Sequence, residues 1–342
     1  MISKREMKRA VLQAPRQLKF EDLDINIEKL GRDQIYAETE CSAVSVGTEA
    51  AAYLGLPPLR ADVTYPRFVG YCNVARVRKV GQETSGIKVD DRIITHQSHQ
   101  SAFICQAHEV LAVVPQAIAS PTASLAYLAQ LGLASLQKAQ YCPGENVAVL
   151  GLGVLGLSTV GVAAALGAQV VAIGNDESRL MKARELGAQT CVRWDDSDIA
   201  SRIDAATGGV GIDLLITTAN SWEAWRTAME AVRRQGRVAV LGFPGRGEAP
   251  PSFNPLDPRW FYGKQLSIFA TGAVPELLAP PGDIRFTLHR NMQLVLRLVQ
   301  DGKLGLERLI THHPPWHELE VIYKLAGAKD KSLIAAVLGW SK

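Results

Sequence analysis

The chain has 342 residues, 47% of them hydrophobic, and a formal net charge of +3. This length exceeds one average domain and fits two, with enough apolar residues for a large core. The nearly balanced charge excludes a strongly basic nucleic-acid-binding surface, and the sequence contains no apolar run of membrane-spanning length, so neither a nucleic acid nor a membrane is expected as partner.

Residues 1–9 are charged and lack the apolar centre of a signal peptide, so we expect no secretory leader. The five cysteines are odd in number and dispersed, with no C-x-x-C pair, and this usage predicts a reduced protein with free thiols. Together these features favour a cytoplasmic location. The cysteines are Cys41, Cys72, Cys105, Cys142 and Cys191.

Residues 1 to about 118 have the pattern of a β-rich module. Residues 34–39 have strand character, and residues 73–80 alternate apolar and polar side chains as a half-buried strand does. Pro121 then opens a helical segment that extends to Leu136. The module is therefore expected to end near residue 119.

From about residue 120 to 275, strands and helices alternate, which is typical of a parallel sheet. The stretch 147–157 joins an apolar strand to a G-x-G-x-x-G motif, and a second apolar strand follows at residues 168–173. This context predicts a dinucleotide site, whereas a glycine-rich turn that only packs a helix on a sheet is the alternative. The expected contacts are Gly151, Gly153, Val154, Leu155 and Gly156, where the helix N-terminus faces the pyrophosphate.

The end of the second strand indicates which nicotinamide binds. An NAD enzyme usually carries an acidic residue there, but this chain has Gly174 followed by Asn175 and Asp176. A glycine leaves room for a 2′-phosphate, Asn175 can donate to it, and Arg179 can pair with it. We therefore expect NADPH, while Asp176 keeps NADH possible.

Several short strings resemble the medium-chain dehydrogenase/reductase superfamily. They are residues 89–93, residues 143–145 before the glycine motif, and residues 185–188. The resemblance implies an α/β protein with a GroES-like β-rich catalytic domain and a Rossmann domain with a doubly wound parallel sheet. We expect residues 1–119 and 276–342 to form the first domain and residues 120–275 the second.

The positions that hold catalytic zinc in this superfamily carry other residues here. The cysteine before Gly-Thr-Asp corresponds to Val46, the histidine of Gly-His-Glu to Tyr71, and the third ligand falls near Tyr127. Zinc needs sulfur, imidazole or carboxylate ligands, so we expect no zinc. The Ser-x-Gly-Thr-Glu run and the ending Leu338-Gly339-Trp340 resemble the zinc-free subgroup that includes bacteriochlorophyllide a dehydrogenase.

Without zinc, a side chain must supply the proton or hydrogen bond that stabilises the reacting group. Tyr71 is the first candidate, although it could equally be an aromatic wall residue. A histidine on the loop after a strand could exchange protons near neutral pH. The candidate catalytic residues are Tyr71, Thr48, Ser45, Glu49 and His99.

The superfamily resemblance implies further cofactor contacts and a homodimer. Contacts are expected at the ends of three later strands, at Thr218, Ala219, Gly242, Phe243, Thr271 and Gly272. The edge strand at residues 265–270 often joins two subunits in this superfamily.

The leading functional hypothesis is a zinc-independent, NADPH-dependent reductase of a C=C, C=O or C=N bond in a small organic molecule. An NAD-dependent alcohol dehydrogenase without zinc and a non-catalytic nucleotide-binding protein are the alternatives.

Overall fold

The computed structural model describes residues 7–57, 64–272 and 285–340. The chain forms two compact units, residues 1–127 with 310–342 and residues 128–309. The expected division at residues 119/120 and 275/276 differs from this one, because residues 120–127 fall in the first unit and residues 285–309 in the second. The segment 285–309 begins with helix α8 (Leu288–Gln300), whose Asn291 exchanges amide hydrogen bonds with Gln137 of α3 (Ala126–Lys138).

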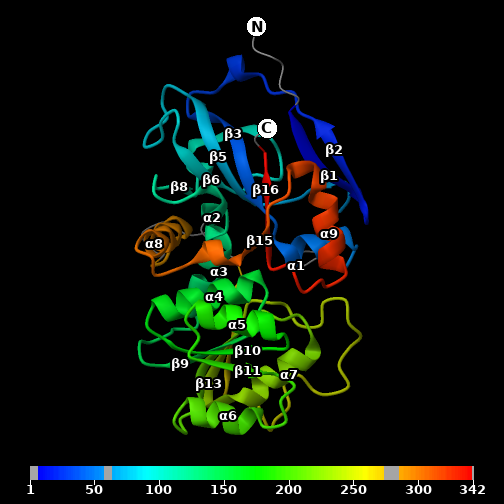
Figure 1. The fold of residues 1–342 in the computed structure, drawn as a ribbon, viewed down its shortest axis with the longest axis vertical. Coiled ribbons are helices and arrows are strands. Elements are labelled where there is room, and N and C mark those ends of the chain that lie inside the picture. Colours follow the sequence, from blue (N-terminus) through cyan, green and yellow to red (C-terminus); the bar gives the residue numbers. More distant parts are fainter. Residues whose placement is uncertain (1–6, 58–63, 273–284, 341–342) are drawn as a thin grey trace. The chain divides into compact units, whose positions relative to one another are not determined.

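The first unit is built on two sheets whose neighbouring strands are antiparallel except for the parallel pair β15 and β16. A three-stranded sheet has the order β2-β1-β4, and a seven-stranded sheet has the order β15-β16-β3-β5-β6-β8, with β7 paired to β3. The C-terminal strand β16 returns to pair with β3 (Figure 1). The strands are β1 (Lys8–Ala14), β2 (Gln17–Asp22), β3 (Gln34–Ala43), β4 (Arg67–Phe68), β5 (Cys72–Val80), β6 (Arg92–Thr95), β7 (Ala102–Gln106), β8 (Ala112–Val113), β15 (Ile310–His312) and β16 (Ala335–Gly339).

Two helices of the first unit pack together through aromatic rings. Helix α1 (Val46–Tyr53) and helix α9 (Leu319–Gly327) meet at Tyr53 and Tyr323, whose ring centroids lie 5.3 Å apart. Both tyrosines are buried in one apolar cluster with Leu319 and Ile322. The short helix α2 (Ser120–Ser124) and the 3-10 turns η1 (Ile27–Lys29), η2 (Ala107–Glu109) and η6 (Trp316–Glu318) complete the helical elements described in this unit.

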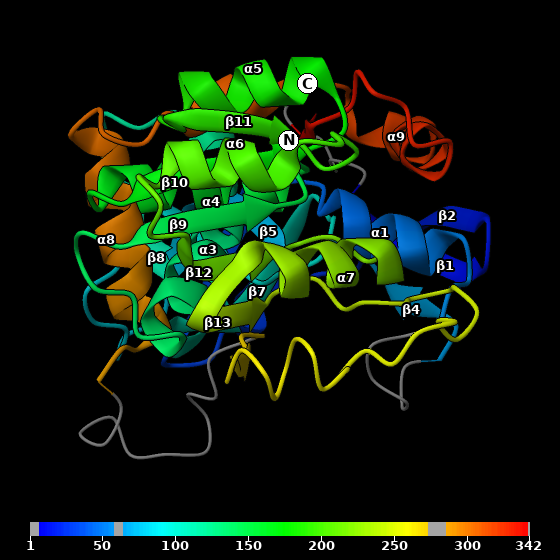
Figure 2. The same ribbon diagram turned by 90° about the horizontal axis from the view of Figure 1, so that it is seen from below.

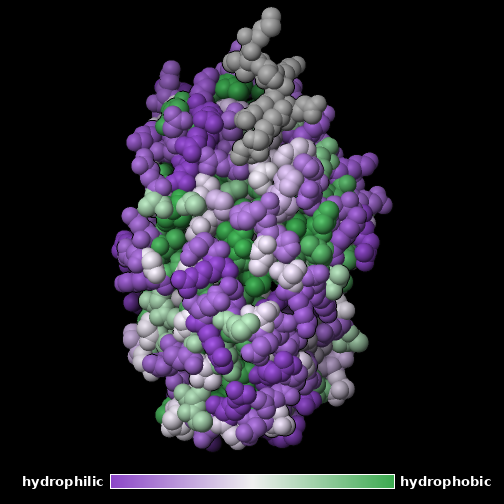
Figure 3. Space-filling view, viewed as in Figure 1, coloured by the Kyte–Doolittle hydropathy of each residue, from purple (hydrophilic) through white to green (hydrophobic). Residues whose placement is uncertain are grey.

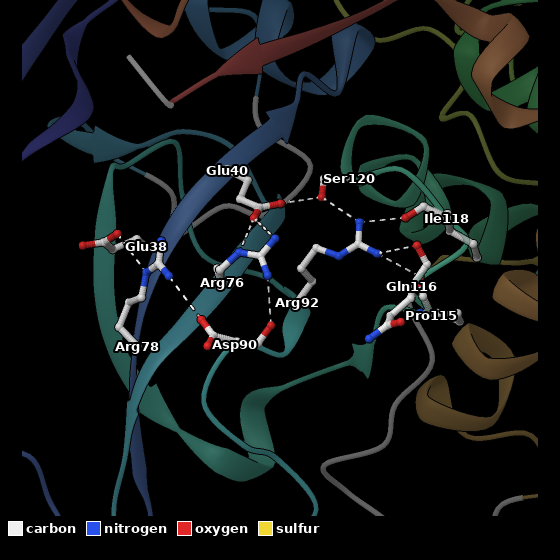
Figure 4. A network of polar contacts seen from close by, with 10 residues as sticks. All are labelled: Glu38, Glu40, Arg76, Arg78, Asp90, Arg92, Pro115, Gln116, Ile118 and Ser120. Atoms are coloured by element: carbon white, nitrogen blue, oxygen red, sulfur yellow. Dashed lines mark hydrogen bonds and ion pairs between the residues drawn. The ribbon is translucent and has the colours of Figure 1, made fainter.

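A charged network joins strands β3, β5 and β6 to the segment that enters α2 (Figure 4). Arg92 donates to four oxygens of that segment, the carbonyls of Ile118 at 2.7 Å, Pro115 at 2.9 Å and Gln116 at 3.1 Å, and the Ser120 hydroxyl at 3.1 Å. Ser120 in turn donates to Glu40, which also binds Arg76. One arginine therefore satisfies carbonyls that no regular element pairs, and so fixes the chain between β8 and α2.

The second unit contains one parallel sheet of six strands in the order β11-β10-β9-β12-β13-β14 (Figure 2). The chain moves outward from β9 to β11 and then returns to the other side of β9 with β12, so the strand order reverses beside β9. The strands are β9 (Asn146–Leu150), β10 (Gln169–Gly174), β11 (Thr190–Arg193), β12 (Ile212–Thr217), β13 (Val232–Val240) and β14 (Ser267–Ala270).

Helices pack on this sheet as in a doubly wound fold. Helices α4 (Val154–Ala165) and α5 (Glu177–Glu185) contact each other and strand β10. Helix α7 (Trp222–Ala231) contacts β12 and β13, and helix α6 (Ile199–Ala206) contacts β11, with Ile203, Trp225 and Met229 in a common core cluster with the strands. Burial of this cluster is the main force that holds the unit together.

Polar residues cover most of the face drawn in Figure 3, and hydrophobic residues occur on it in small groups. Among the described residues, no helix has both the length and the apolar character that a bilayer crossing requires.

Candidate nucleotide and catalytic sites

The glycine-rich turn in the second unit has the geometry that the sequence predicted. Gly151 has a φ of +93°, in the region that favours glycine. A Cβ at Gly156 would lie 1.8 Å from the Gly151 carbonyl oxygen, so only glycine allows α4 to begin so close to β9. At Gly153, by contrast, a Cβ would have no described atom within 4 Å. Gly156 and Gly153 therefore have different roles. Gly156 shapes the turn, whereas Gly153 leaves open space.

Helix α4 begins at this open space. Its N-cap is Gly153, which provides no side-chain cap for the N–H groups of Val154 and Leu155. Uncapped N–H groups at a helix N-terminus, together with the helix dipole, favour an anionic ligand. The start of α4 therefore has the chemistry that the expected phosphate site requires.

The ends of the neighbouring strands lie close to the same turn. Thr218 Oγ1 donates to the Gly151 carbonyl at 2.7 Å, and a Cβ at Gly151 would lie 2.9 Å from the Ala219 nitrogen. A Cβ at Gly242 would lie 2.4 Å from the Thr218 carbonyl, so the segment after β13 also passes closely here. Phe243, the next residue, is 61% exposed. Three of the expected cofactor contacts, Thr218, Ala219 and Gly242, therefore lie close together beside the turn.

The last expected pair of contacts has a different environment. Thr271 is fully buried, and its hydroxyl accepts from Ser135 at 3.0 Å and donates to the Val240 carbonyl at 3.0 Å. The Gly272 carbonyl accepts from Lys138 at 3.3 Å. The Thr271 side chain thus ties β14 to α3 and β13.

The end of β10 packs directly against the glycine-rich turn. A Cβ at Gly174 would lie 2.7 Å from Leu152 Cδ1, and Arg179 Nη1 donates to the Leu152 carbonyl at 3.5 Å. Asp176 is the N-cap of α5, where its carboxylate accepts from the Arg179 N–H and from the Ser178 hydroxyl. Asn175 between them is exposed. A side chain at position 174 would therefore have to displace the end of the Leu152 side chain, a contact that the sequence did not reveal.

In the first unit, helix α1 carries three of the catalytic candidates at its start. Ser45 is the N-cap, but its hydroxyl does not cap the helix. Instead Glu49 Oε1 accepts the Ser45 N–H at 2.7 Å, and the Ser45 hydroxyl accepts a hydrogen bond from Tyr71. Thr48 also bonds to Tyr71. The structure therefore brings Ser45, Thr48, Glu49 and Tyr71 together around one phenol.

Tyr71 is surrounded by aromatic rings. Its ring lies edge-on to Tyr127, with centroids 5.7 Å apart, and Tyr127 lies edge-on to His96 at 4.5 Å. Burial is the largest cause that raises the pKa of Tyr71, and the nearby Cys72 and Glu49 raise it further, while the hydrogen bonds that Tyr71 shares with Ser45 and Thr48 lower it. The phenol therefore stays protonated at neutral pH, which is the state that can donate.

His99 and Glu49 lie deeper than Tyr71. His99 is fully buried and Glu49 is 3% exposed, with His99 Nε2 2.9 Å from Glu49 Oε2. The other ring nitrogen, Nδ1, lies 2.7 Å from the Ser42 hydroxyl. Both nitrogens of His99 are thus engaged inside the unit, which favours a supporting role over contact with a substrate.

The residues at the expected zinc positions do not fit that metal. Val46, Tyr71 and Tyr127 offer an aliphatic side chain and two neutral phenols, and the described parts of the chain contain no group of three or more His, Cys, Asp or Glu placed to hold a metal ion. Cys72 is fully buried, and burial together with Glu49 raises the pKa of its thiol well above 9.0.

Sequence reasoning did not assign functions to Ser42, Tyr323 and Trp340. Tyr323 donates to Glu49 Oε2 at 2.6 Å across 274 positions of the sequence, and Trp340 donates to Ser42 at 2.8 Å across 298 positions. Contacts at such separations leave no local pattern, so the sequence offered no signal for them.

The chain is similar in sequence and in fold to known dehydrogenases. Residues 154–276 match the family model described as zinc-binding dehydrogenase. The chain is 22% identical over 275 residues to the sorbitol dehydrogenase of Bacillus subtilis, covering 71% of this chain and 77% of that protein. It is 29% identical over 197 residues to the NADP-dependent isopropanol dehydrogenase of Thermoanaerobacter brockii, covering 57% of this chain and 52%, about half, of that protein.

Among solved structures, the 2R,3R-butanediol dehydrogenase of Bacillus subtilis superposes with a TM-score of 0.78 at 19% identity, covering 97% of this chain and 99% of that one. This likeness confirms the expected fold, a β-rich GroES-like domain and a Rossmann domain. In sequence the chain is therefore similar to dehydrogenases, and in fold it is similar to 2R,3R-butanediol dehydrogenase.

Proposed function

We propose that this protein is a zinc-independent, NADPH-dependent reductase of a C=C, C=O or C=N bond in a small organic molecule. Hydride transfer is the chemistry that a bound nicotinamide supplies. The observation that carries the proposal is the Tyr71 phenol at a zinc-ligand position, protonated and held by the Ser45 and Thr48 hydroxyls. This arrangement also supports membership of the zinc-free subgroup that includes bacteriochlorophyllide a dehydrogenase.

In this proposal Tyr71 takes over the electrostatic task of the missing metal. Negative charge develops on the substrate oxygen, nitrogen or carbon as hydride arrives, and the phenol turns its O–H from Ser45 to that atom and donates a hydrogen bond or its proton. Thr48 and Ser45 orient the phenol. Glu49 and His99, which are buried, hold the segment that carries Ser45. Tyr127 and His96 border the phenol, and desolvation lowers the pKa of His96 from 6.5 although part of its ring is exposed, so it is neutral at pH 7.

For the cofactor, we propose that the 2′-phosphate of NADPH binds at Asn175 and Arg179. Arg179 bonds to Leu152 within the glycine-rich turn, so its guanidinium lies near the path of the nucleotide. An arginine can pair with a phosphate through two parallel hydrogen bonds. Replacing Arg179 with Met should weaken binding of NADPH about tenfold or more and leave NADH nearly unchanged, while Arg184→Met on the exposed side of the same helix is the matched control.

Asp176 favours the alternative, an NAD-dependent alcohol dehydrogenase without zinc. Its carboxylate stands one residue beyond Asn175 and could also accept from ribose hydroxyls. Fluorescence titration with both nicotinamides distinguishes the two functions, because the alternative requires tighter binding of NADH than of NADPH.

The main test combines metal analysis with turnover. Purified protein is analysed for zinc, then mixed with NADPH and a representative ketone, enone and cyclic imine while absorbance at the reduced nicotinamide band is followed. We expect less than one-tenth equivalent of zinc and NADPH oxidation with at least one class. One equivalent of zinc that is needed for turnover contradicts the proposal, and tight NADPH binding without oxidation of any probe favours a non-catalytic nucleotide-binding protein.

We further propose a homodimer formed through β14, the edge strand of the six-stranded sheet. An open edge strand with half-exposed Ile268 and Phe269 invites pairing with a second copy. Light scattering should give about twice the 37.0 kDa chain mass; a monomeric mass contradicts this proposal.

A further inference from the structure

A line of buried polar side chains crosses the first unit from the C-terminal strand to helix α1. Trp340 Nε1 donates to Ser42 Oγ at 2.8 Å, Ser42 Oγ lies 2.7 Å from His99 Nδ1, and His99 Nε2 lies 2.9 Å from Glu49 Oε2. Ser42 and His99 are fully buried, and Trp340 and Glu49 are nearly so. Because buried polar groups are rarely left unsatisfied, the proton positions along this line can be deduced.

The indole of Trp340 sets the direction of the line. An indole N–H can only donate, so the Ser42 oxygen accepts from it. In the described part of the chain the other contact of Ser42 Oγ is His99 Nδ1, so the Ser42 proton points there. Nδ1 is then an acceptor, which places the imidazole proton on Nε2. A cationic His99 would leave the Ser42 proton without an acceptor.

The line of hydrogen bonds ends at the Glu49 carboxylate, and both of its oxygens accept hydrogen bonds. Its Oε2 accepts from His99 Nε2 and from the Tyr323 hydroxyl at 2.6 Å, and its Oε1 accepts the Ser45 N–H at 2.7 Å. Every partner donates, so the ionised form is the one that this arrangement stabilises. Glu49 thereby does the work of a helix cap, and the Ser45 hydroxyl remains available to accept from Tyr71.

His99 also contacts Gly70, the residue that precedes Tyr71 in the sequence. Gly70 precedes Tyr71 and has a φ of +88°, and a Cβ there would lie 2.7 Å from His99 Cδ2 and Cγ. The imidazole ring therefore rests against the Gly70 backbone while its Nε2 bonds to Glu49. One ring holds both segments that determine where the phenol lies, the Gly70–Tyr71 segment and the Ser45 segment.

We propose that Trp340 is a positioning residue for Tyr71, acting through Ser42 and His99 and setting His99 as the neutral Nε2–H tautomer. The catalytic consequence rests on the proposed function, in which Tyr71 is the proton donor. The line itself does not, since it needs neither NADPH nor substrate.

The test uses NMR of the full chain with ¹⁵N-labelled histidine and ¹³Cζ-labelled tyrosine, without any ligand. The His99 and Tyr71 signals are assigned with His99→Gln and Tyr71→Phe. Trp340→Phe removes the indole donor, and Ser42→Ala removes the link by a smaller change in case the first variant does not fold. Trp316→Phe is the matched control, since Trp316 stacks on Trp340 with centroids 5.5 Å apart and an interplanar angle of 9°.

In the unsubstituted chain we expect the two-bond ¹⁵N–¹H pattern of a neutral Nε2–H imidazole for His99. In Trp340→Phe or Ser42→Ala this pattern should lose its single-tautomer character, and the Tyr71 signal should shift by more than its linewidth. In Trp316→Phe both signals should stay in place.

Three results would overturn the proposal: an Nδ1–H or cationic His99 in the unsubstituted chain, a Tyr71 signal that ignores Trp340→Phe and Ser42→Ala, or equal shifts in the Trp316→Phe control. The proposed function fails by different observations, namely bound catalytic zinc or no oxidation of NADPH. An inactive protein that shows the expected NMR pattern therefore leaves this inference intact.

Discussion

His99 donates through Nε2 to Glu49 at 2.9 Å in the interior of the first unit, although 50 positions separate the two residues in the sequence. Glu49 carries a negative charge at 3% exposure, and such a charge is tolerated only when its oxygens are hydrogen-bonded. The buried charge of Glu49 therefore depends on the hydrogen bond from His99.

Replacing His99 with Leu removes one of the three donors to Glu49. We expect a loss of about 2–4 kcal/mol in the free energy of unfolding, because a buried carboxylate is left partly unsatisfied. Urea denaturation measures the change. The control is His96→Leu, because the exposed His96 ring donates to no buried carboxylate among the described residues. A loss of equal size in both variants would contradict the assignment of the effect to Glu49.

Replacing Tyr71 with Phe removes the phenol that Ser45 and Thr48 hold. If this phenol is the general acid, turnover should fall by about 10²–10⁴ while the affinity for NADPH stays the same. Steady-state kinetics and a cofactor titration give the two quantities. Tyr36→Phe, a buried tyrosine elsewhere in the same unit, is the matched control. An unchanged rate in Tyr71→Phe would remove the phenol from this role.

Two glycine substitutions should separate cofactor binding from folding. In Gly153→Asp the new side chain enters space free of described atoms, so the melting temperature should change little, but its volume and charge should abolish NADPH binding. In Gly156→Ala the new methyl would lie 1.8 Å from the Gly151 oxygen, so stability should fall as well. Calorimetry and fluorescence titration test both, and normal NADPH binding by Gly153→Asp would argue against the site.

Replacing Arg92 with Lys should release the segment between β8 and α2. A lysine cannot reproduce the planar set of bonds to Ile118, Pro115, Gln116 and Ser120. We expect a loss of about 1–3 kcal/mol in the free energy of unfolding and faster hydrogen exchange in residues 115–120. Arg78→Lys, on a more exposed arginine of the same network (Figure 4), should cost less than 1 kcal/mol.

The buried acidic groups predict the alkaline limit of stability. Burial raises the pKa of Cys41 and Cys105 from 9.0 to about 12, and it raises the pKa of Tyr323 well above 10.0. Between pH 9 and 12 the unfolded chain loses these protons while the folded chain keeps them. The contribution of these groups to the free energy of unfolding is therefore fully present below pH 9 and is lost as pH rises. Each group contributes a slope of about 1.4 kcal/mol per pH unit.

This alkaline slope can be measured by urea denaturation at a series of pH values. Cys105→Ala should make the curve shallower above pH 9 without changing its shape below pH 8. A curve that is flat up to pH 11 would show that these thiols and phenols do not stay protonated in the folded chain.

The sequence predicted most regular elements because their signals are local. Strand β10 was expected from the apolar run at residues 168–173, and the glycine spacing of 151, 153 and 156 reflects contacts within one turn. Helix α1 was not predicted, although it carries Ser45, Thr48 and Glu49. Its start has no side-chain N-cap bond, since Glu49 reaches back to the Ser45 N–H instead, so the usual capping signal is missing.

By itself, the sequence determined the two kinds of domain, the glycine spacing of the turn after β9 and the non-ligating side chain of Val46, because each depends on residue type and short spacing. Only the tertiary structure decided that Gly174 faces Leu152 and that His99 bonds to Glu49 and Ser42. It also brought Tyr323 and Trp340 to the same buried line. Those contacts join strands and helices distant along the chain, and hydrophobic packing of whole elements, rather than any local preference, brings them together.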